Sequence, residues 1–527
     1  MTPTPAPNAA RILLRGGSVL GVDGAFERAD VLVGDGVVLA VAPDLRDRTD
    51  EVLDCSGRVV LPGFIDAHSH ADAALFDPAA QLALLRQGVT SVVLGQDGVG
   101  FAPGSGAYAT RYFGAINGPH PTYRGGGIGA LLGTYEGTTP LNAAVLVPAG
   151  TVRHEVRGDE PGPASERELH AMRALVRRGL AEGAVGLSTG LDYIPGAFAG
   201  TAELIELCRD VAAARGLYVS HVRGGYEANL GTGLREVRRI IEETGVRAHV
   251  SHLHAPIDVA VPLLDDLERA GIELSFDSYP YSRGCTLLSM LALPPELAST
   301  GPDLLQSAAG SAGGRERIRR LVTGRVTARP DLGPGWAEQI TLSHVPSSTY
   351  GHLEGRTLAH VARIEGEDPA ALAIELLLAT RMQATVIMAV PIPRSAQQLA
   401  ALFVRDGHLG GSDGIFVGGH PHPRAAGTFA RYLADYARPG LLTWAQVVDH
   451  LSTATAARFR LGKRGAVRPG WIADLTVVSP DEVAPQATYE NPKALAIGID
   501  DVLVAGIPVL SGGRLTGATP GRALRRA

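Results

Sequence analysis

Lysine is nearly missing from this chain of 527 residues, whose 48 basic residues include only two lysines, Lys463 and Lys493. The other basic residues are arginines spread along expected helices, where a solvated surface is the simplest interpretation. The formal net charge of −6 is small, and no basic stripe or run indicates a surface for nucleic acid. We therefore expect a protein that has no nucleic-acid partner.

Cysteine is also scarce, and long apolar runs do not occur. The three cysteines, Cys55, Cys208 and Cys285, exclude a disulfide framework and suit a reducing compartment. No apolar segment is long enough to span a bilayer, so we expect no membrane partner. The opening Met-Thr-Pro-Thr-Pro-Ala-Pro-Asn has neither a basic n-region nor an apolar h-region, which argues against a signal peptide. A cytoplasmic location is the expectation.

Histidine and aspartate recur where short apolar runs end. His68 and His70 close the run Leu61-Pro-Gly-Phe-Ile-Asp-Ala, and alternation along an extended segment would place both imidazoles on one face. Four further candidates each follow a β-like stretch: Asp97, His221, His252 and Asp413. A divalent metal site explains this order most economically, and a metal site of this kind indicates a hydrolase.

Apolar β-like runs alternate with helical stretches through the centre of the chain, as βα units require. We expect eight strands, which end near His70, Gln96, Pro148, Ser188, His221, His252, Asp277 and Asp413. The candidate ligands then follow strands one, two, five, six and eight, at the C-terminal face where barrel enzymes place their chemistry. The prediction is an α/β fold with a TIM-like (β/α)8 barrel over 62–465.

Three other features complete the predicted architecture. Ser165 and Glu168 have capping-box spacing and precede an apolar stripe, which predicts a helix. Residues 287–380 are too long for one βα unit, so we expect an insertion over the barrel mouth there. Short β-rich runs at both ends predict one small β-sandwich domain, formed by 1–61 together with 466–527.

Several segments resemble the amidohydrolase superfamily and, within it, the D-aminoacylase or N-acyl-D-amino-acid deacylase family. The resemblance spans nearly the whole chain. Its segments are Leu61-Pro-Gly-Phe-Ile-Asp-Ala-His-Ser-His70, Gly88-Val-Thr-Ser-Val-Val-Leu-Gly95, Gly183-Ala-Val-Gly-Leu-Ser-Thr-Gly-Leu-Asp-Tyr-Ile-Pro-Gly196, Ser251-His252, Tyr279-Pro-Tyr281, Gly411-Ser-Asp-Gly414, His422-Pro-Arg-Ala-Ala-Gly-Thr-Phe429 and Arg464-Gly-Ala-Val-Arg-Pro-Gly-Trp-Ile-Ala-Asp-Leu475.

Two positions depart from that family. Where the family has a metal-binding cysteine, this chain has Asp97, and where the family has a lysine on the substrate side, this chain has His254. A carboxylated lysine from the barrel, which many relatives use to bridge two metals, is excluded because both lysines follow the last expected barrel strand. Asp97 is therefore the expected bridge, although its Asp-Gly context also fits a plain turn residue. Zinc is the expected ion, one or two per site, with manganese or cobalt as alternatives.

The resemblance implies hydrolysis of the amide bond of N-acyl-D-amino acids by metal-activated water, giving a carboxylate and a free D-amino acid. Asp413 would act as general base and then general acid, as well as a metal ligand. Tyr193, Tyr281 and Arg283 resemble positions that line the family's substrate pocket. Arg223 lies two residues past His221, and its guanidinium suits a substrate carboxylate, although a structural salt bridge at the barrel rim fits equally well.

Two other functions stay open on the sequence alone. One is hydrolysis of a cyclic amide, a dipeptide or an isopeptide, because a metal core does not distinguish these bonds. The other is a non-catalytic scaffold on an inactive barrel. The preference for D over L rests on resemblance only, and neither the acyl group, the preferred side chain, the number of metal ions nor the oligomeric state follows from the sequence.

Overall fold

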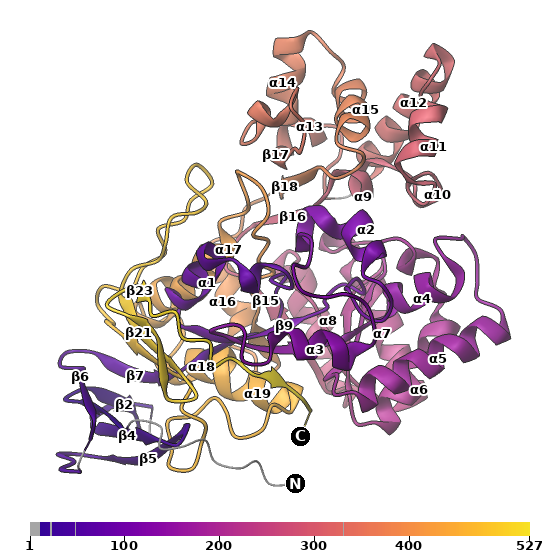
Figure 1. Ribbon diagram of the computed structural model, residues 1–527. Coiled ribbons are helices and arrows are strands. Elements are labelled where there is room, and N and C mark those ends of the chain that lie inside the picture. The colour runs from indigo at the N-terminus through magenta and orange to yellow at the C-terminus, as the bar shows by residue number, and fades with distance from the viewer. Residues whose placement is uncertain (1–10, 22–23, 48, 330, 391, 527) are drawn as a thin grey trace.

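The structure is a computed structural model that describes residues 11–21, 24–47, 49–329, 331–390 and 392–526. Its centre is a barrel of parallel strands with helices outside it (Figure 1). The barrel strands are β8 (Phe64–Asp66), β9 (Val89–Leu94), β10 (Asn142–Val145) continued by β11 (Val147–Pro148), β12 (Gly186–Gly190), β13 (Leu217–His221), β14 (Arg247–Val250), β15 (Leu274–Ser278) and β19 (His408–Gly410). These are the eight strands that the sequence predicts.

The first and last strands meet and close the barrel. Neighbouring strands pair in parallel from β8 to β10 and from β11 to β19. At the seam, Ala67 N donates to Gly410 O, and Ser69 forms a parallel bridge with Gly414. The C-terminal ends of all eight strands therefore share one face, where barrel enzymes build their active sites.

Helices cover the outside of the barrel because each has one apolar face. In α5 (Glu166–Ala181), Ser165 and Glu168 form the predicted capping box, and Met172, Val176 and Leu180 are buried. The next helices in order are α6 (Thr201–Ala213), α7 (Leu230–Thr244), α8 (Ile257–Arg269) and α16 (Ala396–Phe403). Among the residues that the structure describes, no helix has both the length and the apolar character needed to cross a bilayer.

The two ends of the chain share a β-sandwich beside the barrel. One sheet has the order β5-β4-β1-β6, and the other runs β23-β22-β21-β20-β7-β2-β3. The key contact is between β7 (Val59–Pro62) and β20 (Leu475–Val478), which pair antiparallel although they lie far apart in sequence. Inward-facing residues from both ends, such as Leu14, Val60 and Leu503, form one buried core. The fold class is therefore the predicted one, while the exact limits of the two domains stay a prediction.

A separate lobe stands above the barrel mouth (Figure 1). It contains an antiparallel sheet of β16 (Arg283–Leu287), β18 (Thr385–Ala389) and β17 (Ile340–His344). Its helices are α9 (Leu288–Ala292), α10 (Pro295–Ala298), α11 (Gly301–Ala308), α12 (Ala312–Ala328), α13 (Trp336–Gln339), α14 (Leu358–Glu365) and α15 (Pro369–Ala379). Because β16 begins five residues after β15 ends, the lobe is held directly over the strand ends.

A short strand near the C-terminus enters the barrel wall. β24 (Ala523–Leu524) pairs in parallel with β10, so that Ala143 lies opposite Ala523. Leu524 belongs to the apolar cluster inside the barrel, with Ile65, Val93 and Val219. A strand that follows the sandwich strands in sequence thus adds to the barrel wall beside β10.

Candidate metal centre and substrate pocket

Four imidazoles surround one carboxylate at the C-terminal face of the barrel. Nε2 of His68 and Nε2 of His252 lie 3.7 and 3.5 Å from Asp97 Oδ1. Nε2 of His70 and Nδ1 of His221 lie 3.6 and 4.0 Å from Asp97 Oδ2. All five side chains are buried. The structure thus brings together five of the six residues that the sequence indicated as ligands, four histidines around Asp97.

Asp97 belongs to two groups of possible ligands. His68 and His70 form one group with it, and His221 and His252 form the other, with the ligand atoms of each group within 4.8 Å of one another. Because the two groups share Asp97, this carboxylate could serve an ion held by either group, and it needs no chemical modification to do so.

The loop after β9 is shaped to deliver this carboxylate. Asp97 has a positive φ of 54°, and its backbone carbonyl packs against Gly190 at the end of β12. A Cβ at Gly190 would lie 2.0 Å from that carbonyl oxygen, so only glycine fits there. His252 and Asp413 also have positive φ values, of 33° and 48°, and such backbone strain is common at functional sites.

Polar partners orient the imidazoles from outside the cluster. Asn117, at the end of α2 (Ala107–Asn117), accepts a hydrogen bond of 3.1 Å at Oδ1 from His70 Nδ1. Asp192, just after β12, lies 3.3 Å at Oδ2 from His221 Nε2. Each contact turns the other ring nitrogen toward Asp97, as partners of metal-binding histidines commonly do.

Asp277 on β15 contacts three histidines. Its Oδ2 lies 3.4 Å from His68 Nδ1 and 2.9 Å from His249 Nε2, and its Oδ1 accepts a hydrogen bond from the backbone N of His252. Burial would raise the pKa of Asp277, but His68 and His249 lower it below its ordinary value. Asp277 is therefore an ionised residue that fixes ligands on two strands.

Asp413 reaches the cluster through the seam of the barrel. Its backbone N donates to His68 O, and Ser412 beside it donates from its backbone N to Asp66 Oδ1. Asp413 Oδ1 lies 3.3 Å from His70 Nε2, while Oδ2 lies 2.7 Å from Arg424 Nη2. Burial raises the pKa of Asp413, but the charge of Arg424 contributes most to lowering it below its ordinary value. The carboxylate is thus held ionised.

The donor set fits a divalent cation. His68 Nε2 and Asp97 Oδ1 are buried atoms without a hydrogen-bond partner among the described residues, which would be costly unless an ion filled the space between them. Although burial lowers the pKa of His70, its contacts with Asp413 and Asp97 raise it to about 10. The site therefore attracts positive charge strongly, and its nitrogen and carboxylate donors are those of zinc sites.

A small inner pocket of about 60 Å³ opens beside the cluster. His221, His252 and Asp413 form its polar side, and Cys285, Thr286, Met290 and Met388 contribute from the lobe. Two predicted substrate-binding residues line it. Tyr193 donates or accepts a hydrogen bond of 3.0 Å with Thr286 Oγ1, and His254 is held through Nδ1 by Glu227 at 2.9 Å.

The other three predicted substrate-binding residues lie outside this pocket. Arg223 makes two bonds to Glu236 and one each to the carbonyls of Ala197 and Ala199, so its contacts are those of the alternative interpretation, a salt bridge at the barrel rim. The Tyr281 ring lies beneath the Arg431 guanidinium, 4.3 Å from it. Arg283 stacks on Tyr489 at 4.0 Å. Tyr279 lines the pocket in place of Tyr281.

Arg424 is the functional candidate that sequence reasoning missed. Its guanidinium is fully buried, ion-paired with Asp413 and 4.6 Å from the centre of the Tyr279 ring. Nε and Nη1 have no hydrogen-bond partner among the described residues. Arg424 begins α17 (Arg424–Arg431), directly after His422-Pro423. That segment was noticed only as a family motif, and nothing in its spacing shows that the arginine turns inward to Asp413.

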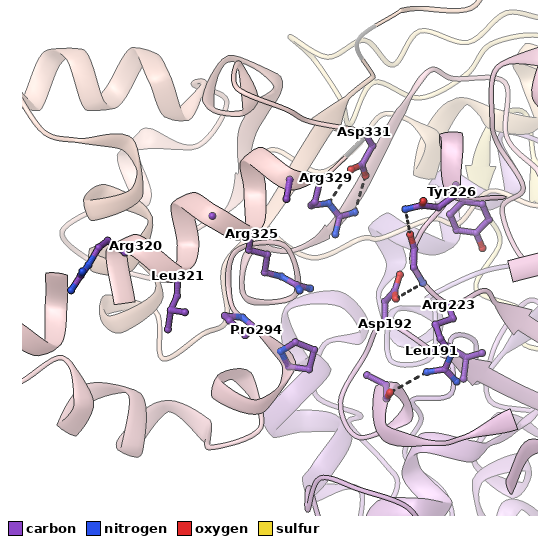
Figure 2. A pocket seen from close by; sticks show the side chains of 16 residues that line it. Leu191, Asp192, Arg223, Tyr226, Pro294, Arg320, Leu321, Arg325, Arg329 and Asp331 are labelled. Atoms are coloured by element: carbon purple, nitrogen blue, oxygen red, sulfur yellow. Dashed lines mark hydrogen bonds and ion pairs between the residues drawn. The ribbon is translucent and has the colours of Figure 1, made fainter. Parts of the chain in front are cut away.

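A second cavity, of about 700 Å³, adjoins the inner pocket between the barrel rim and the lobe (Figure 2). The two share four lining residues: Asp192, Tyr226, Arg329 and Asp331. On the lobe side the outer cavity is lined by Pro294 and by residues of α12 and its end, among them Leu321, Gly324 and Arg325. Arg329 and Asp331 form an ion pair of 2.7 Å at the junction.

The barrel, its sandwich and the histidine–aspartate cluster define a metal-dependent hydrolase of the amidohydrolase type. The chain belongs to the amidohydrolase family, whose profile matches residues 51–510. It is 32% identical to the D-aminoacylase of Alcaligenes xylosoxydans xylosoxydans, over 98% of this chain and 97% of that protein. It is 31% identical to the N-acyl-D-glutamate deacylase of the same organism, over 98% and 96% of the two chains.

Solved structures agree with these relatives. A crystal structure of D-aminoacylase superposes with a TM-score of 0.82 at 30% identity, over 98% of this chain and all of that one. The N-acyl-D-glutamate deacylase of Bordetella bronchiseptica, complexed with zinc and a phosphonate that mimics the tetrahedral intermediate, gives 0.81 at 29% identity, over 98% and 99%. Another D-aminoacylase structure is described as having a binuclear metal centre.

Proposed function

We propose that this protein hydrolyses N-acyl-D-amino acids to a carboxylic acid and a free D-amino acid. The observation that carries the proposal is the shared placement of Asp413 and Arg424 beside the four-histidine cluster. Asp413 lines the inner pocket, and Arg424 is buried behind it and ion-paired with its Oδ2. The resemblance to D-aminoacylase and N-acyl-D-glutamate deacylase over the whole chain supports the same substrate class.

The residues that would hold the metal are His68, His70, Asp97, His221 and His252, with Asp413 at the edge of the first group. When bound there, a divalent ion lowers the pKa of water and polarises the scissile carbonyl. Zinc is the proposed ion because the donors are imidazoles and a carboxylate, and manganese or cobalt are the alternatives.

Asp413 is placed to move the proton. Its Oδ1 faces His70 and the inner pocket, whereas its Oδ2 is fixed by Arg424. It would accept a proton from the attacking water and pass it to the amine nitrogen as the C–N bond breaks, so one carboxylate serves as base and then as acid. Rigid fixation by Arg424 keeps Oδ1 in the same position for both steps.

Arg424 is the proposed receptor for the α-carboxylate of the substrate. Its buried guanidinium retains unpaired N–H groups beside Tyr279, and two parallel hydrogen bonds to a carboxylate match its planar shape. His254, held by Glu227, lies on the wall of the inner pocket and offers a further donor. Arg424 therefore replaces Arg223 in our assignment of the carboxylate site.

The three cysteines are unpaired, as a reducing cytoplasm would keep them, and we place the protein in that compartment.

The deciding experiment is release of free amine from paired N-acetyl-D- and N-acetyl-L-amino acids by purified enzyme loaded with zinc. Cleavage of the D series that is lost after chelation and restored by zinc is the expected result. Cleavage of hydantoins or dihydropyrimidines instead would reassign the enzyme to cyclic amides. A protein that retains no metal and cleaves none of these substrates would be the scaffold that the sequence left open.

A further inference from the structure

The inner pocket is too small for a whole substrate. Its volume of about 60 Å³ is well below the roughly 300 to 1,000 Å³ of ordinary small-molecule sites. The scissile amide and its immediate substituents fill such a space, so the two ends of an N-acyl amino acid must leave it in different directions. One direction is fixed by the proposed function, on which this inference rests: the α-carboxylate lies at Arg424, against Tyr279.

The other direction leads into the outer cavity. The four residues common to both spaces, namely Asp192, Tyr226, Arg329 and Asp331, do not include Tyr279 or Cys285, which line only the inner pocket. The outer cavity thus adjoins the inner pocket on the wall away from the Tyr279 contact with Arg424. The chain attached to the reacting carbonyl would pass Tyr226 and Arg329 to reach the outer cavity.

One arginine that lines the outer cavity has no ion-pair partner among the described residues. Four arginines line it, and three of them have carboxylate partners: Arg223 with Glu236, Arg320 with Glu316, and Arg329 with Asp331. Its two lining carboxylates are both engaged, because Asp331 pairs with Arg329 and Asp192 holds His221 and the backbone N of Gly224. Among the described residues, the fourth lining arginine has no carboxylate within ion-pair distance, although the charges of Asp192 and Glu296 act on it from farther away.

That cation is Arg325 on α12. Its Nε and Nη2 donate to the backbone carbonyls of Leu291 and Met290, and no carboxylate of the described residues lies within ion-pair distance. Figure 2 shows the side chain pointing from the lobe toward the barrel side of the cavity. Two carbonyl contacts leave three of the five guanidinium N–H groups for a ligand. The contacts also hold the group in place, so that a second anion can bind with little loss of side-chain freedom.

We propose that the outer cavity binds the acyl group of the substrate and that Arg325 binds a carboxylate at the far end of that group. The preferred substrates are then N-(ω-carboxyacyl)-D-amino acids, the monoamides of dicarboxylic acids. The apolar surface of Leu191, Ala197, Pro294 and Ala328 accommodates the methylene chain between the amide and the terminal carboxylate.

The test compares pairs of substrates that share a D-amino acid and an acyl length. N-succinyl is compared with N-butanoyl, and N-adipoyl with N-hexanoyl, with N-acetyl as the reference. For at least one length, KM is expected to be about 10 to 100 times lower for the carboxylate-ended member, the range of a charge-assisted hydrogen bond. The ratio of kcat/KM within a pair is the readout, because it cancels changes in folding and metal content.

Arg325→Gln is expected to remove this ratio, and Arg325→Lys to restore part of it. Arg317→Gln is the matched control, because Arg317 is an exposed residue of α12 outside the cavity lining. Since Arg325 also binds two backbone carbonyls, Gly324→Leu provides an independent variant. A Cβ at Gly324 meets no atom within 4 Å, so a side chain can begin there without a clash and narrow the cavity. It is expected to raise KM for hexanoyl and adipoyl substrates more than for N-acetyl.

The outcomes separate the two proposals. An enzyme that cleaves N-acetyl-D-amino acids with equal or better use of neutral acyl groups would overturn the inference and leave the proposed function intact. The inference would also be overturned if Arg325→Gln abolished a preference for substrates with acidic D-amino-acid side chains. The outer cavity would then bind the amino-acid end of the substrate and not its acyl end. Failure on every N-acyl-D-amino acid would refute the proposed function itself.

Discussion

Asp413 contacts both parts of the proposed catalytic site, the histidine cluster and Arg424. One carboxylate oxygen faces His70 at 3.3 Å, and the other faces Arg424 at 2.7 Å. Asp413→Asn keeps the shape but removes the proton acceptor. We expect turnover to fall by about 100-fold to 10,000-fold, the range of general acid–base catalysis. Bound metal should stay close to its normal content, measured by elemental analysis on the same sample. Unchanged turnover would remove Asp413 from the proton path.

Arg424 and Arg283 give opposite expectations that can be tested side by side. Arg424 is buried against Asp413, whereas Arg283 stacks on Tyr489 away from the inner pocket. Arg424→Gln should lower kcat/KM on N-acetyl-D-amino acids by about 100-fold, as expected for a lost charged hydrogen bond. Arg283→Gln should change it far less. If the larger loss instead followed Arg283→Gln, the earlier assignment of Arg283 to the substrate would be right.

At the scale of elements, the C-terminal ends of adjacent strands build the site, and β15 shows how. It contributes no ligand, yet Asp277 at its end contacts His68, which follows β8, and His252, which follows β14. Asp277→Asn should weaken zinc binding by about 10-fold to 100-fold, as with other orienting partners of metal ligands. Competition with a fluorescent chelator measures this affinity. A variant that binds zinc as tightly as the natural protein would show that Asp277 does not orient the ligands and that β15 serves only as a strand of the barrel.

The sequence predicts those features that repeat locally and misses those that depend on distant contacts. Strand-end positions identified His68, His70, His221 and His252, because a ligand at the end of a buried strand is a local pattern. Asp277 was recognised as a strand end but not as a partner of His68. Arg424 follows the last strand by 14 positions, and its direction is set by the seam of the barrel, which no local pattern contains. Arg223 has the spacing from His221 that a substrate-binding residue would need, but its guanidinium is ion-paired with Glu236 on α7.

At the scale of the whole molecule, buried neutral histidines away from the site make stability depend on pH. His408 Nδ1 lies 3.2 Å from His450 Nδ1, and its Nε2 is 3.1 Å from Tyr432 Oη. Burial lowers the pKa of His450 to about 4 and that of His408 well below its ordinary value. Because the unfolded chain takes up these protons near pH 6.5, the folded state loses stability as the pH falls from about 6.5 to about 4.

For His450 alone the loss is up to about 3 kcal/mol at the acid end of this window. Urea unfolding at pH 7.5, 6 and 5, with a chelator present throughout, measures the dependence without a contribution from metal release. His450→Gln should give a shallower decline than the natural protein. An identical decline in both would mean that other groups dominate the acid response.

The strand β24 is synthesised long after β10, the strand with which it pairs. The backbone N of Arg522 donates to Asn142 Oδ1, across 380 positions of the chain, and the next residue pairs with β10. At a synthesis rate of about 5 to 20 residues per second, roughly 20 to 80 seconds separate these segments on the ribosome. During that interval β10 lacks the strand that pairs with Ala143 and Ala144, and the apolar cluster to which Leu524 belongs is incomplete.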